Sequence, residues 1–345
     1  MAITLKDIAY MAKTSTASVS MVLNNKKNCR ITDATKERIR KIALELNYRP
    51  NLQAQALSKG KTKVIGILLK SPLSDPWHCA ILEKLQINLR KHNYNSNIYT
   101  CLPDHESIKN GIEYLSQMKV DALVIGPLGF MEEYRLIAKE LENFEYTIAY
   151  DVIENMPINN VKIDSYAAAH MSIEYLASKG HKQIGLVEMQ PKFKTLEDTK
   201  TRHSGYIDAI NEYNLAIRSE WNINIPATDE INEQEFIAIM EKEHHPTAFC
   251  CHNDVTAASI MKILNTHGFS VPNDVSLIGM SDFKIAKFLT PTLTTVSFNL
   301  DSYANAICNM IINGIEHSGK QESIARHIEP PFIIERNSVK VITTT

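Results

Sequence analysis

The chain has 345 residues, with 37 Lys and Arg against 39 Asp and Glu and a net charge of −2 at pH 7. This length allows one small domain and two of ordinary size. No run of 18 apolar residues is present, and the first residues lack the apolar core of a signal peptide, so we expect a cytoplasmic protein with no membrane partner. The six cysteines form no CxxC pair, and the adjacent Cys250 and Cys251 lie in an apolar stretch that favours buried thiols over a strained disulfide.

The charge is distributed unevenly along the chain. Residues 1–63 contain 13 Lys and Arg against four Asp and Glu, a net charge of +9, which leaves −11 for the remainder. A basic head on an acidic body suits a head that binds phosphates while the body repels nucleic acid. The alternative is a merely solvated basic face, which the helix pattern of the same segment makes the weaker interpretation.

The first residues predict two short helices separated by about three residues. Thr4 can cap the first helix, with Asp7 three positions later, and its apolar stripe is Leu5, Ile8, Ala9 and Ala12. Ser15 can cap a second helix over residues 16–23, whose inward side chains are Val19, Val22 and Leu23. The opposite face of that helix carries Thr16, Ala17, Ser20 and Met21. This arrangement is typical of a helix-turn-helix, whose second helix enters a major groove.

A third helix completes the predicted head. Thr32 can cap it, and the apolar residues recur at helical spacing as Ile39, Ile42, Ala43 and Leu46. Residues 51–58 follow with good helix formers but only two turns, before Lys59-Gly60-Lys61-Thr62 interrupts the pattern. A helix this short is marginal alone in water. One interpretation of this segment is a linker with incidental helicity.

From Val64 onward, apolar strands alternate with amphipathic helices. The predicted strands are 64–69, 97–101, 122–125, 147–150, 161–163, 184–187, 249–252, 276–280, 294–298 and 332–335. Among the predicted helices are 77–92, 104–118, 166–179, 201–214 and 254–267. Such alternation indicates doubly wound parallel sheets, in which ligands bind beyond the carboxyl ends of the strands.

No catalytic motif is found in the sequence. It has no nucleophile elbow, no phosphate-binding glycine run, no HExxH and no metal-ligand spacing of Cys and His, so we expect neither an enzyme nor a metal or cofactor. Polar residues do follow several strands. Asp75 and Trp77 follow the first body strand, Asp151 follows strand 147–150, and Asn253 follows strand 249–252. A carboxylate and an indole face suit a small polar ligand, although each such residue alone is more often a helix cap or a loop residue.

The chain resembles the lactose/galactose repressor (LacI/GalR) family along almost its whole length. In the head, the similarity is carried by TLKDIA at 4–9, STASVSMVLN at 15–24 and LNYRPN at 46–51. In the body, it is carried by IDSY at 163–166, YLASKGHKQIG at 175–185, PNDVSLIG at 272–279 and LTPTLTTV at 289–296. The resemblance implies a body like a periplasmic binding protein, with two subdomains joined by three crossings, which we place near 161–163, 291–294 and 321–326.

The resemblance also implies a set of DNA contacts. Residues 51–58 would form a hinge helix that orders on the operator, where Leu57 enters the minor groove as an apolar wedge. Gln53 stands where the family usually has an apolar residue that helps to pair the hinges. Met21 stands where the family often has Arg or His. The expected DNA-binding residues are Thr4, Leu5, Ser15, Thr16, Ala17, Ser18, Ser20, Met21, Asn24, Asn51, Ala54 and Leu57.

For the effector, the resemblance points to the cleft between the subdomains. Arg202 matches the cleft arginine of the family, whose planar fork can hold vicinal hydroxyls or a carboxylate. Ser281 replaces the first carboxylate of a Gly-aromatic-Asp-(Asp/Asn) motif, with Asp282 beside it. We expect Arg202 and Asp151 to clamp polar groups while Trp77 covers an apolar face. The expected ligand-binding residues are Asp75, Trp77, Asp151, Arg202, Asn253, Ser281, Asp282 and Phe298.

The sequence therefore predicts an α/β protein with a three-helix helix-turn-helix head, a hinge helix and two doubly wound parallel subdomains. The predicted domains are 1–50 for the head, 51–62 for the hinge and 63–345 for the body, with subdomain 1 at 63–161 and 292–322 and subdomain 2 at 162–291 and 323–345. The predicted function is a homodimeric repressor that binds a pseudo-palindromic double-stranded DNA operator and whose affinity is controlled by a small molecule. Its effector is a sugar or glycoside, with a nucleobase, an amino-acid-like metabolite or a phosphoprotein co-regulator as alternatives. A transport solute-binding protein would share the body but not the basic head.

Overall fold

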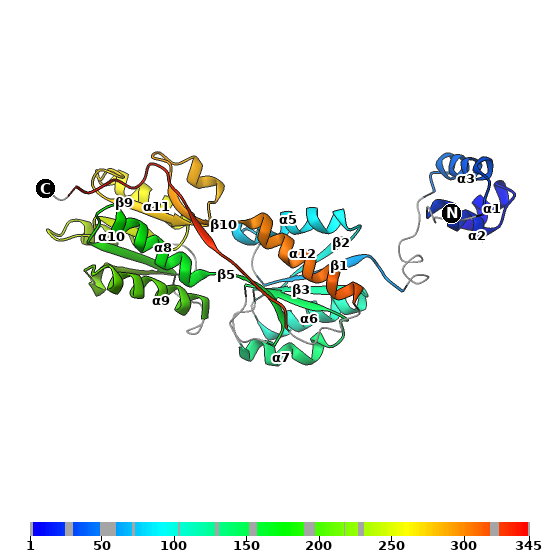
Figure 1. Cartoon of the computed structure of the whole chain (residues 1–345), viewed down its shortest axis with the longest axis horizontal. Coiled ribbons are helices and arrows are strands. Elements are labelled where there is room, and N and C mark those ends of the chain that lie inside the picture. The colour runs from blue at the N-terminus through cyan, green and yellow to red at the C-terminus, as the bar shows by residue number, and fades with distance from the viewer. Residues whose placement is uncertain are drawn as a thin grey trace. The chain divides into compact units, whose positions relative to one another are not determined.

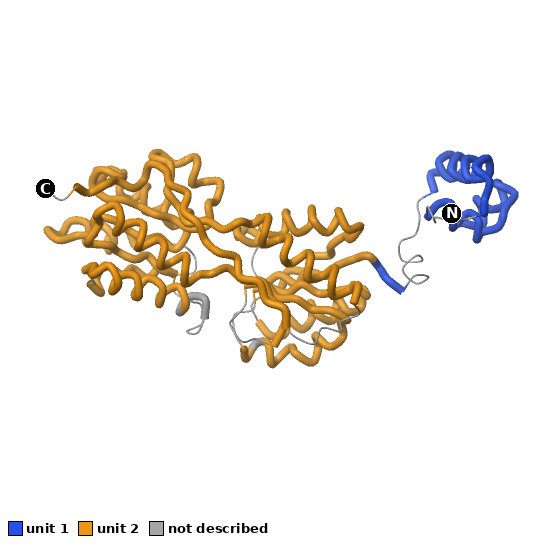
Figure 2. The backbone as a smooth tube through the Cα atoms, in the orientation of Figure 1, with its two compact units in different colours: residues 1–62 blue, residues 63–345 orange. Residues whose placement is uncertain are grey.

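The computed structural model of the chain divides into two compact units, residues 1–62 and 63–345 (Figure 2). It describes residues 3–24, 30–48, 60–70, 73–102, 104–127, 131–151, 157–189, 197–216, 218–226, 231–317 and 324–343. The expected hinge, with Asn51, Ala54 and Leu57, lies outside these residues. Within the described part of the chain, no helix combines the length and the apolar character needed to span a bilayer.

The first unit contains the three predicted helices, α1 (Leu5–Met11), α2 (Thr16–Leu23) and α3 (Asp33–Glu45). Their apolar stripes meet in a small core of Ile8, Ala9, Ala12, Val19, Val22, Ile39, Ile42 and Ala43. At α1, the Asp7 carboxylate accepts hydrogen bonds from the Thr4 amide at 2.8 Å and the Thr4 hydroxyl at 2.7 Å. Thr32 occupies the N-cap of α3, but its side chain makes no capping bond. Its hydroxyl lies 2.9 Å from that of Thr35 instead.

The second unit contains two six-stranded sheets (Figure 1). The first has the order β11 (Arg326–Glu329), β5 (Asn159–Ile163), β4 (Thr147–Tyr150), β3 (Ala122–Gly126), β1 (Val64–Leu69) and β2 (Asn95–Thr100). The second has the order β12 (Pro331–Ile334), β10 (Thr294–Phe298), β9 (Ser276–Met280), β8 (Ala248–Cys251), β6 (Ile184–Met189) and β7 (Asn222–Ile225). All neighbouring strands are parallel except β10 and β12. The predicted pair of parallel sheets is therefore confirmed.

Helices cover both faces of each sheet, which is why strands such as β1, β3 and β8 are almost uniformly apolar. On the first sheet, α5 (Pro76–Lys91) and α12 (Leu300–Glu316) cover one face, and α6 (His105–Gln117) and α7 (Met131–Leu141) cover the other. On the second sheet, α8 (Ser165–Ser178) and α9 (Glu197–Glu212) cover one face, and α10 (Glu233–Met240) and α11 (Asp254–Thr266) cover the other. Short 3-10 turns lie at Ser219–Trp221 and Lys284–Lys287.

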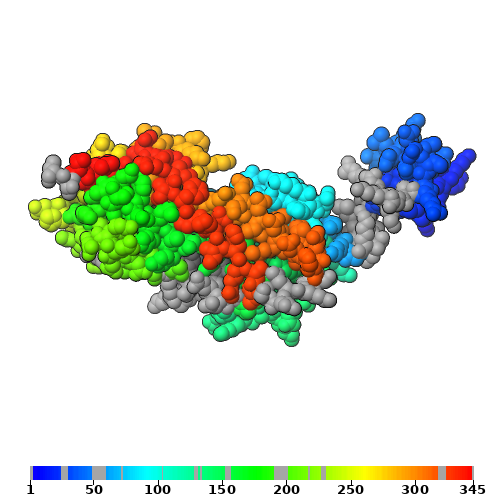
Figure 3. All heavy atoms as spheres, viewed as in Figure 1, coloured from blue at the N-terminus to red at the C-terminus, as the bar shows by residue number. Residues whose placement is uncertain are grey.

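The first passage of the chain between the two subdomains lies where it was predicted, near residues 161–163, whereas the other two differ from the prediction. The chain leaves the first sheet after Ile163, returns after Phe298, and leaves again between Glu329 and Pro331. The predicted crossings near 291–294 and 321–326 are wrong, because β10 belongs to the second sheet and β11 to the first. Residues 294–298 therefore belong to the second subdomain, and 326–329 to the first. The last passage lies in the C-terminal segment, which is red in Figures 1 and 3 and extends across both subdomains.

Two strands, β7 and β11, were absent from the prediction. Both are edge strands, and their sequences contain few apolar residues, two of four in NINI and one of four in RHIE. An edge strand is paired on one side only and needs less apolar surface than a central strand. Hydrophobic periodicity therefore gives a weak signal at these positions.

Candidate functional site

The helix expected to contact bases, α2, presents a short polar face. Thr16 and Ala17 are exposed, Ser20 and Met21 are half-buried, and the other side of the helix packs into the core. Asn24 donates hydrogen bonds from Nδ2 to the Ser20 carbonyl at 2.8 Å and to the Ser20 hydroxyl at 3.2 Å. Through these bonds Asn24 caps the C-terminal end of α2.

The start of α2 is fixed by its N-cap, as the sequence predicts. The Ser15 hydroxyl accepts a hydrogen bond from the Ser18 amide at 3.1 Å and lies 3.0 Å from the Ser18 hydroxyl. Thr4 is exposed at the start of α1, whereas Leu5 is half-buried and packs against the small core. Around these positions, Lys6, Lys13 and Arg40 are also exposed. The first unit thus combines short hydrogen-bonding side chains on one helix with a positive charge suited to phosphates.

In the second unit, the topology brings the carboxyl ends of both sheets to the place where the subdomains meet. Strand β5 ends at the first crossing, so the strands parallel to it end on that side. Helix α8 then runs away from the crossing and β6 returns, so the carboxyl ends of β6, β8 and β9 face the same region (Figure 1). This is where doubly wound folds place their ligands.

One group of candidate residues surrounds the crossings, and we call Trp77, Asp151, Phe298 and Tyr303 the crossover group. Trp77 donates from Nε1 to Asp151 Oδ2 at 2.7 Å, and the Tyr303 hydroxyl donates to Asp151 Oδ1 at 2.6 Å. The Trp77 ring packs against Phe298 at 5.8 Å between centroids and contacts the cores of both subdomains. Burial and the neighbouring Asp151 raise the pKa of Tyr303 well above its ordinary value, so its hydroxyl keeps its proton.

Asp75 and Asn253 serve first as helix caps. Asp75 accepts from the Trp77 amide at 2.9 Å at the start of α5, and Asn253 accepts from the Thr256 amide at 2.8 Å at the start of α11. Both side chains are half-buried. Both residues therefore act as helix caps, which is the role that Asp and Asn most often have after a strand.

The second group lies at the ends of the second sheet and consists of Arg202, His252, Asn253, Ser281 and Asp282; we call it the second-sheet group. Arg202 donates from one terminal nitrogen to His252 Nδ1 at 3.1 Å and to the His252 carbonyl at 3.2 Å. Burial and the Arg202 charge lower the pKa of His252 to about 3. The imidazole is therefore neutral at physiological pH.

A buried carboxyl group, that of Asp254, binds the loop that follows β9. Asp254 Oδ1 accepts from the Thr295 hydroxyl at 2.6 Å, and its Oδ2 accepts from the Phe283 amide at 2.6 Å. Burial raises the pKa of Asp254 to about 7, against the opposing effect of these two hydrogen bonds. In the loop itself, Ser281 and Asp282 have positive φ angles of 99° and 50°. Asp282 pairs with Arg336 at 2.5 Å and with Lys287 at 3.5 Å.

The expected clamp of Arg202 and Asp151 differs from what the structure shows. Arg202 contacts His252, and Asp151 contacts Trp77 and Tyr303, so each belongs to a different group. Asp282 pairs with cationic side chains of its own subdomain because Arg336 reaches it from the segment after β12. The structure does bring Trp77 and Phe298 together, as ring neighbours.

Two residues of these groups were not predicted from the sequence, and neither was the burial of Asp254 beside the loop after β9. His252 was assigned to the end of the predicted strand 249–252, although β8 ends at Cys251. Tyr303 lies inside α12, 152 positions from Asp151, where nothing local marks it. Asp254 occupies the first helical position after Asn253, and its burial is decided by Thr295 and Phe283 from distant segments. Only His252 had a local signal, as a polar residue at the end of an apolar strand.

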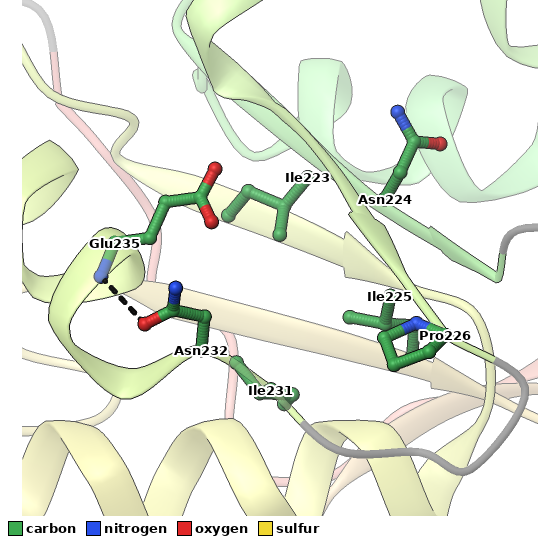
Figure 4. Close-up of a pocket in the computed structure, with 7 residues that line it drawn as sticks. All are labelled: Ile223, Asn224, Ile225, Pro226, Ile231, Asn232 and Glu235. Carbon is green, nitrogen blue, oxygen red and sulfur yellow. Dashed lines mark hydrogen bonds between the residues drawn. The ribbon is translucent and has the colours of Figure 1, made fainter.

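A cavity of about 320 Å³ lies elsewhere, at the edge of the second sheet (Figure 4). Ile223 and Ile225 of β7, Ile231, Asn232 and Glu235 are among the residues that line it. The Asn232 side chain accepts from the Glu235 amide at 3.3 Å and caps α10. No residue of the crossover group or the second-sheet group lines this cavity. In the described part of the chain, no cluster of His, Cys, Asp and Glu has the geometry of a metal site.

Comparison with known proteins identifies both parts of the chain. Residues 4–51 match the family model of bacterial regulatory proteins, lacI family, and residues 173–339 match the periplasmic binding protein-like domain. The chain is 27% identical to the HTH-type transcriptional repressor PurR of Mannheimia succiniciproducens, over 98% of this chain and 99% of that protein. It is 29% identical to PurR of Haemophilus influenzae strain PittEE, with the same coverage.

Solved structures have the same fold. The Lac repressor dimer bound to operator and the anti-inducer ONPF has a TM-score of 0.85 at 20% identity, over 99% of this chain and 100% of that one. The transcriptional regulator CelR in complex with cellobiose has a TM-score of 0.69 at 18% identity, over 97% and 99%.

These matches decide between the two classes of protein that the sequence allowed. A transport solute-binding protein would account for the body but not for a regulatory DNA-binding domain at residues 4–51. The prediction of a DNA-binding transcriptional repressor with an effector-binding domain is confirmed. The chain therefore combines a DNA-binding domain of the lacI family of bacterial regulatory proteins with a periplasmic binding protein-like domain.

Proposed function

We propose that this repressor acts in the cytoplasm as a homodimer on a pseudo-palindromic operator, with Thr16, Ala17, Ser20 and Met21 of α2 facing base edges. The accessible face of α2, where Thr16 and Ala17 are exposed, and the net charge of +9 over residues 1–63 support this proposal. Thr4, Leu5, Ser15, Ser18 and Asn24 would position the helix, and Asn51, Ala54 and Leu57 of the hinge would contact the minor groove. Two-fold symmetry in the protein requires matching half-sites in the DNA.

Replacing Met21 with Arg should change the base preferred at one position of each half-site. Methionine offers only an apolar contact, for example to a thymine methyl, whereas arginine can donate two hydrogen bonds to guanine. A good bidentate pair contributes about 1–3 kcal/mol of discrimination. Selection from a randomised operator library with both proteins measures the change. An unaltered base preference would remove Met21 from the set of base contacts, and Tyr10→Arg, on the exposed surface of α1, controls for the added charge.

For the effector, we propose a nucleobase bound between the crossover group and the second-sheet group. The PurR repressors similar to this chain over almost its full length support this class of ligand. The hydrogen bonds and ion pairs of the two carboxylates also favour a nucleobase, and they are the observation that carries the proposal. Asp151 already accepts two hydrogen bonds and Asp282 pairs with two cations, which leaves few acceptors for the many hydroxyl donors of a sugar. Trp77 and Phe298 supply aromatic surface suited to a planar ligand.

A sugar is the second candidate. The fold neighbours include a LacI family transcriptional regulator with bound ribose and the transcriptional regulator CelR in complex with cellobiose, and Trp77 also suits the C–H face of a sugar ring. Whichever class binds, the expected coupling is the same. The first subdomain follows the DNA-binding unit directly in sequence at residue 63, and the ligand would contact both subdomains. Effector and operator affinities would therefore be linked reciprocally.

Binding by the full-length protein tests the ligand class. A ligand at 100 times its Kd stabilises a protein by about 2.7 kcal/mol, which raises the Tm by roughly 5 °C in a body of this size. We expect a shift of this order with hypoxanthine, guanine or adenine, together with a changed operator affinity in a band-shift assay. Shifts with ribose or cellobiose alone would favour the sugar candidate and contradict the nucleobase proposal.

A further inference from the structure

We propose that His252 is a specificity-determining effector contact whose Nε2–H, fixed in place by Arg202, donates a hydrogen bond to an acceptor atom of the ligand. The inference rests on the proposed function and deepens it, because it says which edge of a nucleobase the site selects. Three observations carry it: the hydrogen bonds of Arg202, the place of His252 in the fold and the state of its second nitrogen.

The contact with Arg202 fixes the tautomer of His252. A guanidinium group carries only donors, so the Arg202 nitrogen 3.1 Å from His252 Nδ1 must donate to a lone pair there. A neutral imidazole with an unprotonated Nδ1 has its hydrogen on Nε2. The same Arg202 nitrogen also lies 3.2 Å from the His252 carbonyl oxygen, so the guanidinium binds the ring and the backbone of one residue. Both contacts hold the ring in one orientation.

The position of His252 makes it a ligand contact rather than a core residue. It follows β8 directly, at the end of the second sheet where the subdomains meet, and its neighbour Asn253 is fixed as the cap of α11. The ring is half-buried. Among the described residues, Nε2 has no hydrogen-bond partner, although Nδ1 has one.

The ring also stays in this state at working pH. Burial and the Arg202 charge lower its pKa to about 3, so protonation does not turn Nδ1 into a second donor. A neutral ring with Nε2–H offers the ligand one donor and no acceptor. It should favour a carbonyl oxygen or an unprotonated ring nitrogen at the facing position and disfavour an amino group, because two facing donors leave both unsatisfied.

Two substitutions separate the two ring nitrogens. His252→Asn places an acceptor near the position of Nδ1, so it keeps a partner for Arg202 but removes the distal donor. His252→Gln places an amide N–H near the position of Nε2. The probes are hypoxanthine and adenine, which differ by an oxo or amino group at one ring carbon, measured by calorimetry on the full-length protein.

We expect hypoxanthine to bind the wild-type protein more tightly than adenine. His252→Asn should weaken hypoxanthine binding roughly 10- to 100-fold, the range for an unmade hydrogen bond to a buried acceptor, and should reduce the preference between the probes. His252→Gln should recover most of the loss. Operator binding without ligand should be unchanged in both variants, because the proposed DNA contacts lie in the other unit.

Other outcomes overturn the inference in distinguishable ways. Equal hypoxanthine affinity in the wild type and His252→Asn would overturn the role of His252 but leave the nucleobase proposal standing. Failure of both nucleobases to bind the wild type would overturn the ligand class and this inference with it. Nitrogen NMR of the wild-type imidazole, assigned by the signals lost in His252→Asn, tests the tautomer without any ligand. A protonated Nδ1 would contradict the proposal.

Discussion

Between about pH 4 and pH 7, the wild-type body should lose roughly 4 kcal/mol of stability, and replacing Asp254 with Asn should abolish this loss. The carboxyl group of Asp254 is fully buried, and burial raises its pKa from 3.8 to about 7. Between these two values the folded protein binds a proton that the unfolded chain has released. Stability is therefore full below the unfolded pKa and is lost as the pH rises through the folded one.

The hydrogen bonds around Asp254 indicate that Asn can replace its protonated form. The Phe283 amide donates to one oxygen, which an Asn carbonyl can also accept. The Thr295 hydroxyl donates to the other oxygen at 2.6 Å, but it also lies 3.3 Å from the Val296 carbonyl. When the hydroxyl turns toward Val296, it can accept from an Asn amide or from a protonated carboxyl group. The variant therefore keeps the partners without the buried charge.

Urea unfolding of the wild type and Asp254→Asn from pH 4 to pH 8 measures the effect as a difference, in which the other titrating groups cancel. The variant should gain on the wild type as the pH rises and level off above pH 7. His181 is one of the groups whose effect cancels, and its effect has the opposite sign, because burial lowers its pKa from 6.5 to about 4. Its contribution to stability is present above pH 6.5 and is lost as the pH falls through 4. A pH-independent difference between the wild type and Asp254→Asn would show that this carboxyl group titrates as an exposed one does.

Those features of the fold that depend on local pattern could be predicted from the sequence. Helix α2 has the predicted bounds because Ser15 caps it and Val19 and Val22 repeat at helical spacing. Strands β1, β4 and β9 also have the predicted bounds, because each is a short and mostly apolar run within a buried sheet. Strand β10 has the predicted bounds too, although only Val296 and Phe298 of its five residues are apolar. The crossings could not be predicted in the same way. Sheet membership depends on pairing between distant segments, and no change of composition marks Phe298 or Glu329 as the last residue on one side.

The candidate site shows the same division. That polar residues follow strands β4 and β8 could be predicted from apolar runs that end in Asp151 and Asn253. The atoms that those residues contact could not be predicted. The partners of Asp151 come from α5 and α12, 74 and 152 positions away, and the partner of Arg202 comes from the end of β8, 50 positions away. Such pairs depend on the packing of whole helices onto sheets, which a single sequence does not contain as a local signal.

Replacing Arg202 with Ala should weaken effector binding by about 30- to 1000-fold, corresponding to roughly 2–4 kcal/mol, and leave operator binding of the ligand-free protein close to wild type. The substitution removes the donor to His252 Nδ1 and to the His252 carbonyl oxygen. The imidazole then loses its fixed tautomer and orientation, and any polar group of the ligand that faced the guanidinium loses its partner. The proposed α2 contacts to DNA belong to the other unit, which the substitution does not touch.

Two further variants separate a specific loss from a general one. Arg218→Ala removes an arginine from the same subdomain, where it lies 3.8 Å from Glu220 at the surface, and should bind effector normally. Arg202→Lys keeps the positive charge but not the planar fork, so it should fall between wild type and Arg202→Ala. Calorimetry with the nucleobase that stabilises the wild type, together with band shifts on the selected operator, gives both affinities. Wild-type effector affinity in Arg202→Ala would exclude Arg202 from the site, and it would leave His252 without the neighbour that fixes its donor.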